Sequence, residues 1–178
     1  MKGELVDALM ELIEKKAGRE KSLIILEKSN LEDSYFTTLD NKTIFEDISD
    51  DKFYKLIKIC CEELFWTKSR FFDEFAFYWT NEYAPQHYRE LYSNIDSAKE
   101  FLLNMNNLHL QLTREMDNAN PPQFDIKKGE ADSIIMTYKS DRSLFELFKS
   151  LIKGVGEYFD EKLEIKATAD NKVEVKFL

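Results

Sequence analysis

Apolar residues in the first half of the chain recur at three- and four-residue intervals, a pattern that predicts a series of amphipathic helices. A stripe that includes Leu5, Leu9 and Leu12 indicates a helix over about residues 3–17, and a shorter helix is expected over residues 19–28. Ser49 stands before two aspartates and suits the N-cap of the next helix. This part of the chain therefore predicts a helical subdomain.

The clearest helical pattern covers residues 96–117. It ends before Pro121 and Pro122, because proline cannot continue a helix. Its apolar residues fall on one face: Ala98, Phe101, Leu102, Met105, Leu108, Leu112 and Met116.

The pattern changes after the two prolines. Residues 133–138, 162–168 and 172–178 have the character of strands, and the spacing over 144–159 is again helical. The last two strands are separated only by the turn at 169–171, which favours antiparallel pairing. We therefore predict an α+β fold and a single domain over residues 1–178. A mainly helical part, 1–120, would pack on a smaller α/β part, 121–178, with a ligand site between them.

Charge and composition narrow the class of partner. The formal charge of −9 argues against a phosphate-binding surface, because nucleic-acid affinity depends on lysine and arginine. The same repulsion disfavours anionic membranes. Neither a signal-peptide core nor a membrane-length apolar run is present, so we expect a cytoplasmic protein. The partners are then expected to be proteins or small molecules.

His109 is the strongest candidate for a functional residue, because of its position in the predicted helix. It lies on the apolar stripe with Met105 and Leu112, which places an imidazole in a hydrophobic environment. Taken alone, a histidine on an apolar face is more often a hydrogen-bonded core residue than a ligand, so a ligand role needs support from other residues. One imidazole is too few for zinc, but it is enough for heme, where the porphyrin supplies four nitrogens. The other histidine, His87, lies in a loop or helix-start context and suits a solvated side chain.

A short polar motif follows the predicted strand at 133–138. Tyr138, Ser140 and Arg142 alternate along the chain, so in an extended segment their side chains would converge and could bind the two heme propionates. So short a pattern often arises by chance, and a surface strand rim explains it about as well.

Together these motifs resemble the heme-nitric oxide/oxygen binding (H-NOX) family, which includes the sensor domain of soluble guanylate cyclase. The similarity extends through almost the whole chain. It is carried by Met1-Lys2-Gly3, residues 46–51, Phe75-x-x-Tyr78-Trp79, Leu108-His109-Leu110-Gln111-Leu112-Thr113, Pro121-Pro122, Tyr138-x-Ser140-x-Arg142 and Phe148-x-x-Leu151-Ile152-x-Gly154.

The resemblance implies a non-catalytic gas sensor that carries heme b between the two parts. His109 would be the proximal iron ligand, the tyrosine–serine–arginine motif would bind the propionates, and Pro122 would press on the porphyrin. Further heme contacts are expected from Met105 and Leu112, and on the distal side from Leu5, Leu9, Trp79, Tyr83, Leu147 and Leu151. In the family, NO weakens the iron–histidine bond, and the effector is a histidine kinase or a diguanylate cyclase.

The resemblance also bears on the choice of gas. Oxygen-binding members use a distal tyrosine on the helix after the propionate motif, and the matching residue here is Leu147. We therefore expect binding of NO and CO without a stable oxygen complex, unless Trp79 or Tyr83 supplies a donor. Two other classes stay open: a heme enzyme, which would need a distal acid/base group, and a heme-free interaction module with His109 as a core residue.

Overall fold

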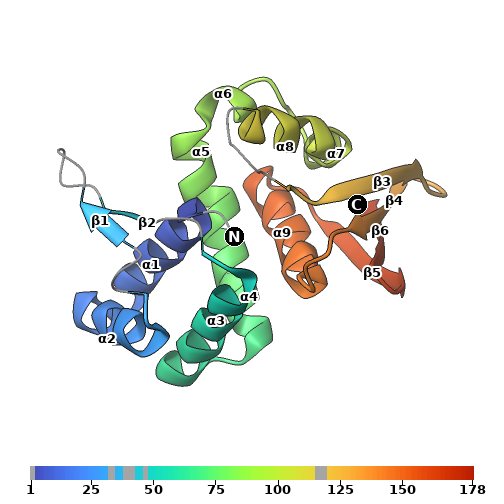
Figure 1. The fold of residues 1–178 in the computed structure, drawn as a ribbon. Coiled ribbons are helices and arrows are strands. Elements are labelled where there is room, and N and C mark those ends of the chain that lie inside the picture. The colour runs from blue at the N-terminus through green and yellow to red at the C-terminus, as the bar shows by residue number, and fades with distance from the viewer. Residues whose placement is uncertain (1–2, 32–34, 38–42, 46–47, 115–119) are drawn as a thin grey trace. The chain divides into compact units, whose positions relative to one another are not determined.

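The computed structural model describes residues 3–31, 35–37, 43–45, 48–114 and 120–178. Within it, the chain forms two compact units, residues 1–78 and 79–178. Figure 1 shows the helices and strands of each unit. The predicted part boundary at residue 120 and the single domain stay predictions. Residues 1–2, 46–47 and 115–119, which carry part of the resemblance and the end of the predicted long helix, lie outside the described residues.

The described residues of the first unit form four helices and a two-stranded antiparallel sheet. The elements are α1 (Gly3–Ala17), α2 (Arg19–Ser29), β1 (Tyr35–Thr37), β2 (Thr43–Phe45), α3 (Asp50–Leu64) and α4 (Lys68–Tyr78). The predicted helix over 3–17 is confirmed; Leu9 and Leu12 of its apolar stripe are buried, and Leu5 is half-buried. Ser49 is the N-cap of α3, as predicted, and its hydroxyl accepts a hydrogen bond from the Lys52 N–H.

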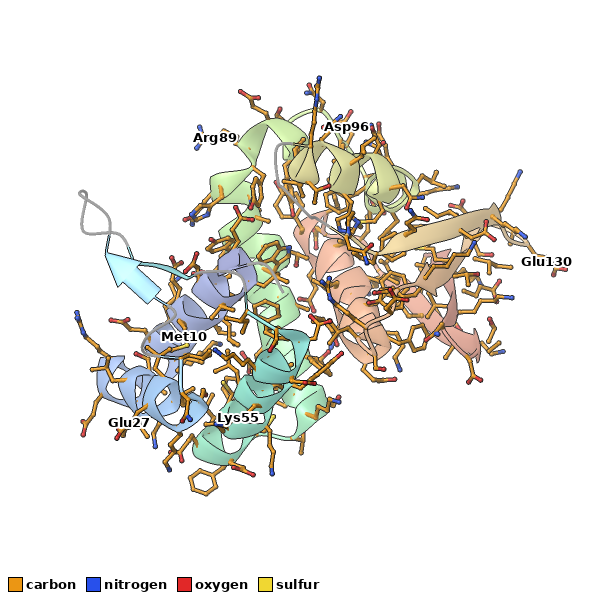
Figure 2. All side chains as sticks on the ribbon, in the orientation of Figure 1. Met10, Glu27, Lys55, Arg89, Asp96 and Glu130 are labelled. Atoms are coloured by element: carbon orange, nitrogen blue, oxygen red, sulfur yellow. The ribbon has the colours of Figure 1, made fainter. Side chains whose placement is uncertain are left out.

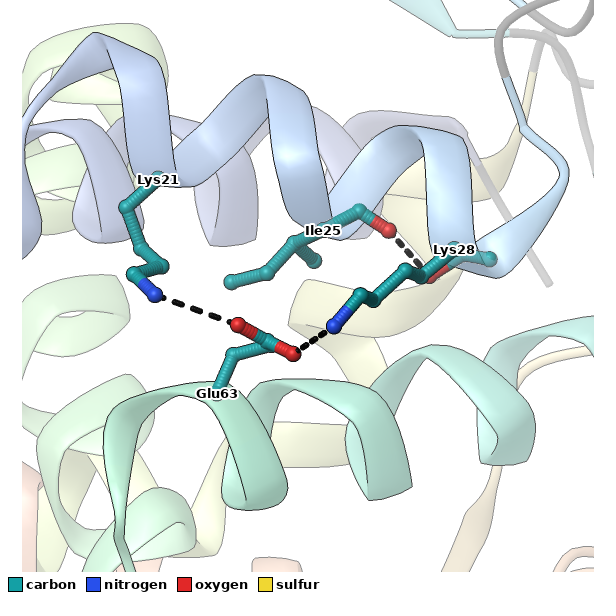
Figure 3. A network of polar contacts seen from close by, with 5 residues as sticks. Lys21, Ile25, Lys28 and Glu63 are labelled. Carbon is teal, nitrogen blue, oxygen red and sulfur yellow. Dashed lines mark hydrogen bonds and ion pairs between the residues drawn. The ribbon is translucent and has the colours of Figure 1, made fainter.

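Polar contacts tie α2 to α3 in this unit (Figure 3). The carboxylate of Glu63 forms ion pairs with Lys21, at 3.1 Å, and with Lys28. These two ammonium groups, Lys28 first, lower the pKa of the Glu63 carboxyl. Beside them, the Ser29 hydroxyl donates to the Ile25 carbonyl at 2.6 Å. Other charged side chains of this unit, such as Glu27 and Lys55, are exposed (Figure 2).

The second unit combines short helices with a four-stranded antiparallel sheet. Its first helical elements are the π-helix η2 (Trp79–Tyr83), α5 (Ala84–His87), α6 (Arg89–Tyr92), α7 (Ala98–Leu103) and α8 (Met105–Thr113). β3 (Gln123–Lys128), β4 (Ser133–Lys139), α9 (Phe145–Tyr158), β5 (Leu163–Ala169) and β6 (Lys172–Phe177) follow. The sheet order is β3-β4-β6-β5 with every pair antiparallel, so the α+β prediction is confirmed. Glu130 marks the turn between β3 and β4 (Figure 2).

Close packing of α9 on the sheet depends on glycine. A Cβ atom at Gly156 would lie 2.8 Å from the Leu163 side chain and 2.9 Å from the Glu161 carbonyl oxygen. The backbone of α9 can therefore approach the start of β5 only without a side chain at this position. Close contact with the start of β5 therefore accounts for a glycine at position 156.

The prediction of one continuous helix over 96–117 is wrong. The helix is interrupted at Asn104, which has φ −90° and ψ 3° and separates α7 from α8. Asparagine is a poor residue for a helix interior because its side chain competes for nearby polar groups, and here the Asn104 Oδ1 accepts from the Asn107 side chain at 3.2 Å. The strand β3 was not predicted, although Phe124 and Ile126 alternate with charged residues there.

Candidate functional site

His109 lies on α8, and one of its ring nitrogens is buried without a hydrogen-bond partner. This atom is Nδ1, the buried side-chain polar atom among the described residues that has no hydrogen-bond partner. A buried polar atom left without a partner costs free energy, so such an atom needs a reason. Burial lowers the pKa of the imidazole from 6.5 to about 4, which keeps the ring neutral at physiological pH. A neutral imidazole in an apolar setting fits the requirement for an axial ligand to heme iron.

An aromatic cluster contacts this imidazole through one ring. The ring of Phe124, in β3, stacks on His109 with a centroid distance of 5.6 Å and an interplanar angle of 22°. Phe148 of α9 stacks in turn on Phe124 at 5.0 Å and on Tyr138 at 5.4 Å. The imidazole therefore belongs to one aromatic cluster with Tyr138, the first residue of the predicted propionate motif.

The other two residues of that motif lie beyond the end of β4. The segment does not stay extended to Arg142: β4 ends at Lys139, and the Arg142 N–H donates to the Ser140 hydroxyl at 3.2 Å. This local turn replaces the convergence that a straight strand would have produced. The Arg142 guanidinium donates to the Asn120 carbonyl at 3.4 Å, so it lies beside the segment that enters Pro121 and Pro122.

The remaining predicted contact residues differ in burial and in the unit to which they belong. Leu147 and Leu151 lie on α9, the first buried and the second half-buried, and Met105, Leu112 and Pro122 are half-buried. Leu5 and Leu9 belong to α1 of the other unit. Their roles at a heme stay predictions.

Trp79, Tyr83 and His87 form a column of stacked rings. The centroid distances are 5.3 Å for Trp79 to Tyr83 and 4.0 Å for Tyr83 to His87. The spacing of four residues along η2 and α5 places these rings on one side of the helix. His87 is exposed, as predicted, and its Nδ1 lies 2.9 Å from the Tyr83 carbonyl oxygen.

Two residues of the site, Asn106 and Phe124, were not predicted from the sequence. Asn106 bonds through its side chain to the backbone of Phe124, and Phe124 carries the ring that stacks on His109. The alternation around Phe124 could have indicated β3. No sequence signal distinguishes Asn106 from its neighbour Asn107.

Two further properties of the described residues bear on the kind of site. No group of three or more histidine, cysteine, aspartate or glutamate side chains is placed to hold a metal ion there. The described helices also include none with the length and apolar character needed to cross a bilayer. The cytoplasmic location stays a prediction.

Comparisons with known proteins identify the family. The sequence profile of the family described as "Haem-NO-binding" matches residues 2–167, so this chain belongs to the haem-NO-binding (H-NOX) family, whose members are heme-based gas sensors. No curated protein matches the sequence.

Solved H-NOX structures have the same fold. A mutant H-NOX from T. Tengcongensis is 24% identical, with a TM-score of 0.82 over 99% of this chain and 97% of that one. A Cs H-NOX mutant, also 24% identical, gives 0.82 over 99% and 96%. An oxygen-binding H-NOX domain described as related to soluble guanylate cyclases is 23% identical and gives 0.77 over 99% and 95%. At these identities the similarity establishes the fold.

The lowered pKa of His109 predicts a pH-dependent stability of the heme-free protein. Above pH 6.5 the imidazole is neutral in both states, whereas between pH 6.5 and about 4 only the unfolded chain takes up the proton. The free energy of unfolding should therefore fall by up to about 3 kcal/mol as the pH decreases through this range. Urea unfolding at pH 7 and pH 4.5 measures the loss, and His109→Gln, which has no imidazole to protonate, should lose less. Equal losses in both proteins would show that His109 does not titrate in this way.

Proposed function

We propose that this protein is a sensor of NO that holds one heme b through His109 and signals to a separate effector protein. The observation that carries the proposal is the neutral, buried imidazole with an unpartnered ring nitrogen, in a chain that belongs to the haem-NO-binding family. When bound, heme supplies a ferrous iron that takes NO or CO as a ligand. We expect the effector to be a histidine kinase or a diguanylate cyclase.

Different residues of the chain would contact the iron, the propionates and the porphyrin of the heme. His109 offers a ring nitrogen that stays deprotonated at physiological pH. Tyr138, Ser140 and Arg142 would bind the propionates, and Pro122, two residues after the carbonyl that accepts from Arg142, would press on the porphyrin. Met105 and Leu112 on α8, with Leu147 and Leu151 on α9, would exclude water around it.

A test of the propionate motif compares Arg142→Ala with Ser140→Ala. A hydrogen bond to a charged group contributes about 1.5–3 kcal/mol and a neutral one about 1 kcal/mol, so heme loss should accelerate about tenfold or more for Arg142→Ala and about fivefold for Ser140→Ala. Transfer of heme to an excess of apomyoglobin measures both rates. Lys139→Ala, which changes an exposed neighbour, is the control. If both variants lost heme at the wild-type rate, Tyr138, Ser140 and Arg142 would be ordinary residues at the end of a strand and would not bind the propionates.

The signal would be release of His109. Helix α8 carries His109 and contacts β3. Release of the imidazole from the iron would therefore let α8 shift, and the effector would respond to the new position of this helix. The reduced protein, mixed with NO under anaerobic conditions, should therefore give the absorption spectrum of a five-coordinate complex at physiological temperature. A spectrum that stays six-coordinate would contradict this switch, and reduced protein without a heme Soret band would contradict the proposed function itself.

A further inference from the structure

Asn106 fastens the helix of His109 to the sheet. It lies on α8 three residues before His109, and both polar atoms of its side chain bond to the backbone of one residue in β3. Nδ2 donates to the Phe124 carbonyl at 2.7 Å, and Oδ1 accepts from the Phe124 N–H at 2.9 Å. We call this pair of hydrogen bonds the Asn106 clamp.

The Asn106 clamp uses the N–H and C=O of Phe124, which point away from the neighbouring strand of the sheet. β3 is an edge strand, and Phe124 lies opposite Tyr138 in β4. The Tyr138 N–H donates to the Asn171 carbonyl at 2.7 Å, on the side of β6. In an antiparallel pair, the N–H and C=O of one residue point to the same side, so Phe124 and Tyr138 do not bond to each other. The Phe124 groups therefore point out of the sheet, where the Asn106 amide meets them as a further strand would.

Phe124, whose backbone Asn106 binds, also contacts the imidazole of His109. While its backbone is held by Asn106, the Phe124 ring stacks on His109 at 5.6 Å. Its opposite residue, Tyr138, is the first of the propionate motif. Phe124 is thus the point at which the helix of the proposed iron ligand and the strand that leads into that motif are joined.

We infer that Asn106 is a positioning residue: its clamp on Phe124 holds α8 in place and thereby sets how firmly His109 holds the iron. The inference rests on the proposed function. Without the clamp, α8 samples more positions relative to β3, so the bond from the imidazole weakens on average. An amide is needed for both bonds, because a carboxylate has no N–H to donate to the Phe124 carbonyl.

Three variants test the inference. Asn106→Ala removes both bonds, and Asn106→Asp keeps only an acceptor for the Phe124 N–H. Asn107→Ala is the matched control, because Asn107 is the next residue of the same helix and its side chain bonds to Asn104 rather than to the sheet. Each protein is studied by hydrogen exchange of the Phe124 amide without heme, and by resonance Raman spectroscopy of the iron–histidine stretch in the ferrous, heme-loaded form.

In Asn106→Ala, Phe124 exchange should be about five- to thirtyfold faster, as loss of one or two kcal/mol of local stability implies, and the stretch should shift to lower frequency. Asn106→Asp should keep the slow exchange and show a smaller shift, and Asn107→Ala should match the wild type. Faster exchange with an unchanged stretch, or unchanged exchange, would overturn the inference and leave the proposed function intact. A wild-type protein without an iron–histidine band would overturn the proposed function, and the inference with it.

Discussion

His109→Gly should bind heme without the ferrous spectrum of the wild type. Because the substitution removes the imidazole and leaves a space on α8, added imidazole should enter that space and restore axial ligation. Glycine costs about 1 kcal/mol in a helix interior, so the fold should survive the change. Absorption spectra of the reduced variant, recorded with and without imidazole, measure both effects.

The other histidine provides the control for this experiment. His87 is exposed on α5, and His87→Gly should keep the wild-type ferrous spectrum. Circular dichroism of both variants would show whether the helices persist. An unchanged ferrous spectrum in His109→Gly, or loss of the spectrum in His87→Gly alone, would mean that the iron ligand has been assigned to the wrong residue.

Much of the fold could be predicted because its signals are local. A stripe of apolar residues repeats within α1, Ser49 caps α3 through a bond to a residue three positions away, and the turn after β5 spans only a few residues. Each of these features depends on neighbours in the sequence, so composition and periodicity reveal it. His109 could be singled out for the same reason, since its position on an apolar face follows from helical spacing.

The features that escaped prediction depend on residues distant in the sequence or on competing local bonds. Asn106 meets Phe124 eighteen positions away, and nothing in the spacing of the two residues indicates that contact. The turn at Ser140 has a side-chain oxygen that accepts from the Arg142 N–H, and the helix breaks at Asn104 through its backbone angles; periodicity expresses neither feature. The hydrogen bonds around His109 therefore could not be predicted from the sequence and are known only from the structure.

The choice of gas depends on whether a hydrogen-bond donor faces the bound ligand. Oxygen bound to ferrous heme takes on negative charge, so a buried donor stabilises it selectively, whereas NO and CO develop much less charge. At the position expected for a donor on α9 this chain has Leu147, which is buried and has no proton to donate. The rings of Trp79 and Tyr83 are stacked in the column that ends at His87. Leu147 at this position therefore predicts a site that is selective against oxygen, unless the indole N–H of Trp79 or the hydroxyl of Tyr83 supplies the donor.

Reduced wild-type protein exposed to air should therefore show no oxygen-bound spectrum, only slow oxidation, while NO and CO both bind. Leu147→Tyr should introduce the missing hydroxyl and lengthen the lifetime of an oxygen-bound form, because one hydrogen bond to a charged group contributes about 1.5–3 kcal/mol, or roughly ten- to a hundredfold in dissociation rate. Leu147→Phe adds the same ring without the hydroxyl and should behave like the wild type. Stopped-flow absorption after mixing with air-saturated buffer distinguishes the three proteins. A persistent oxygen-bound spectrum in the wild type would contradict the prediction, and its loss in Trp79→Phe or Tyr83→Phe would then identify the donor.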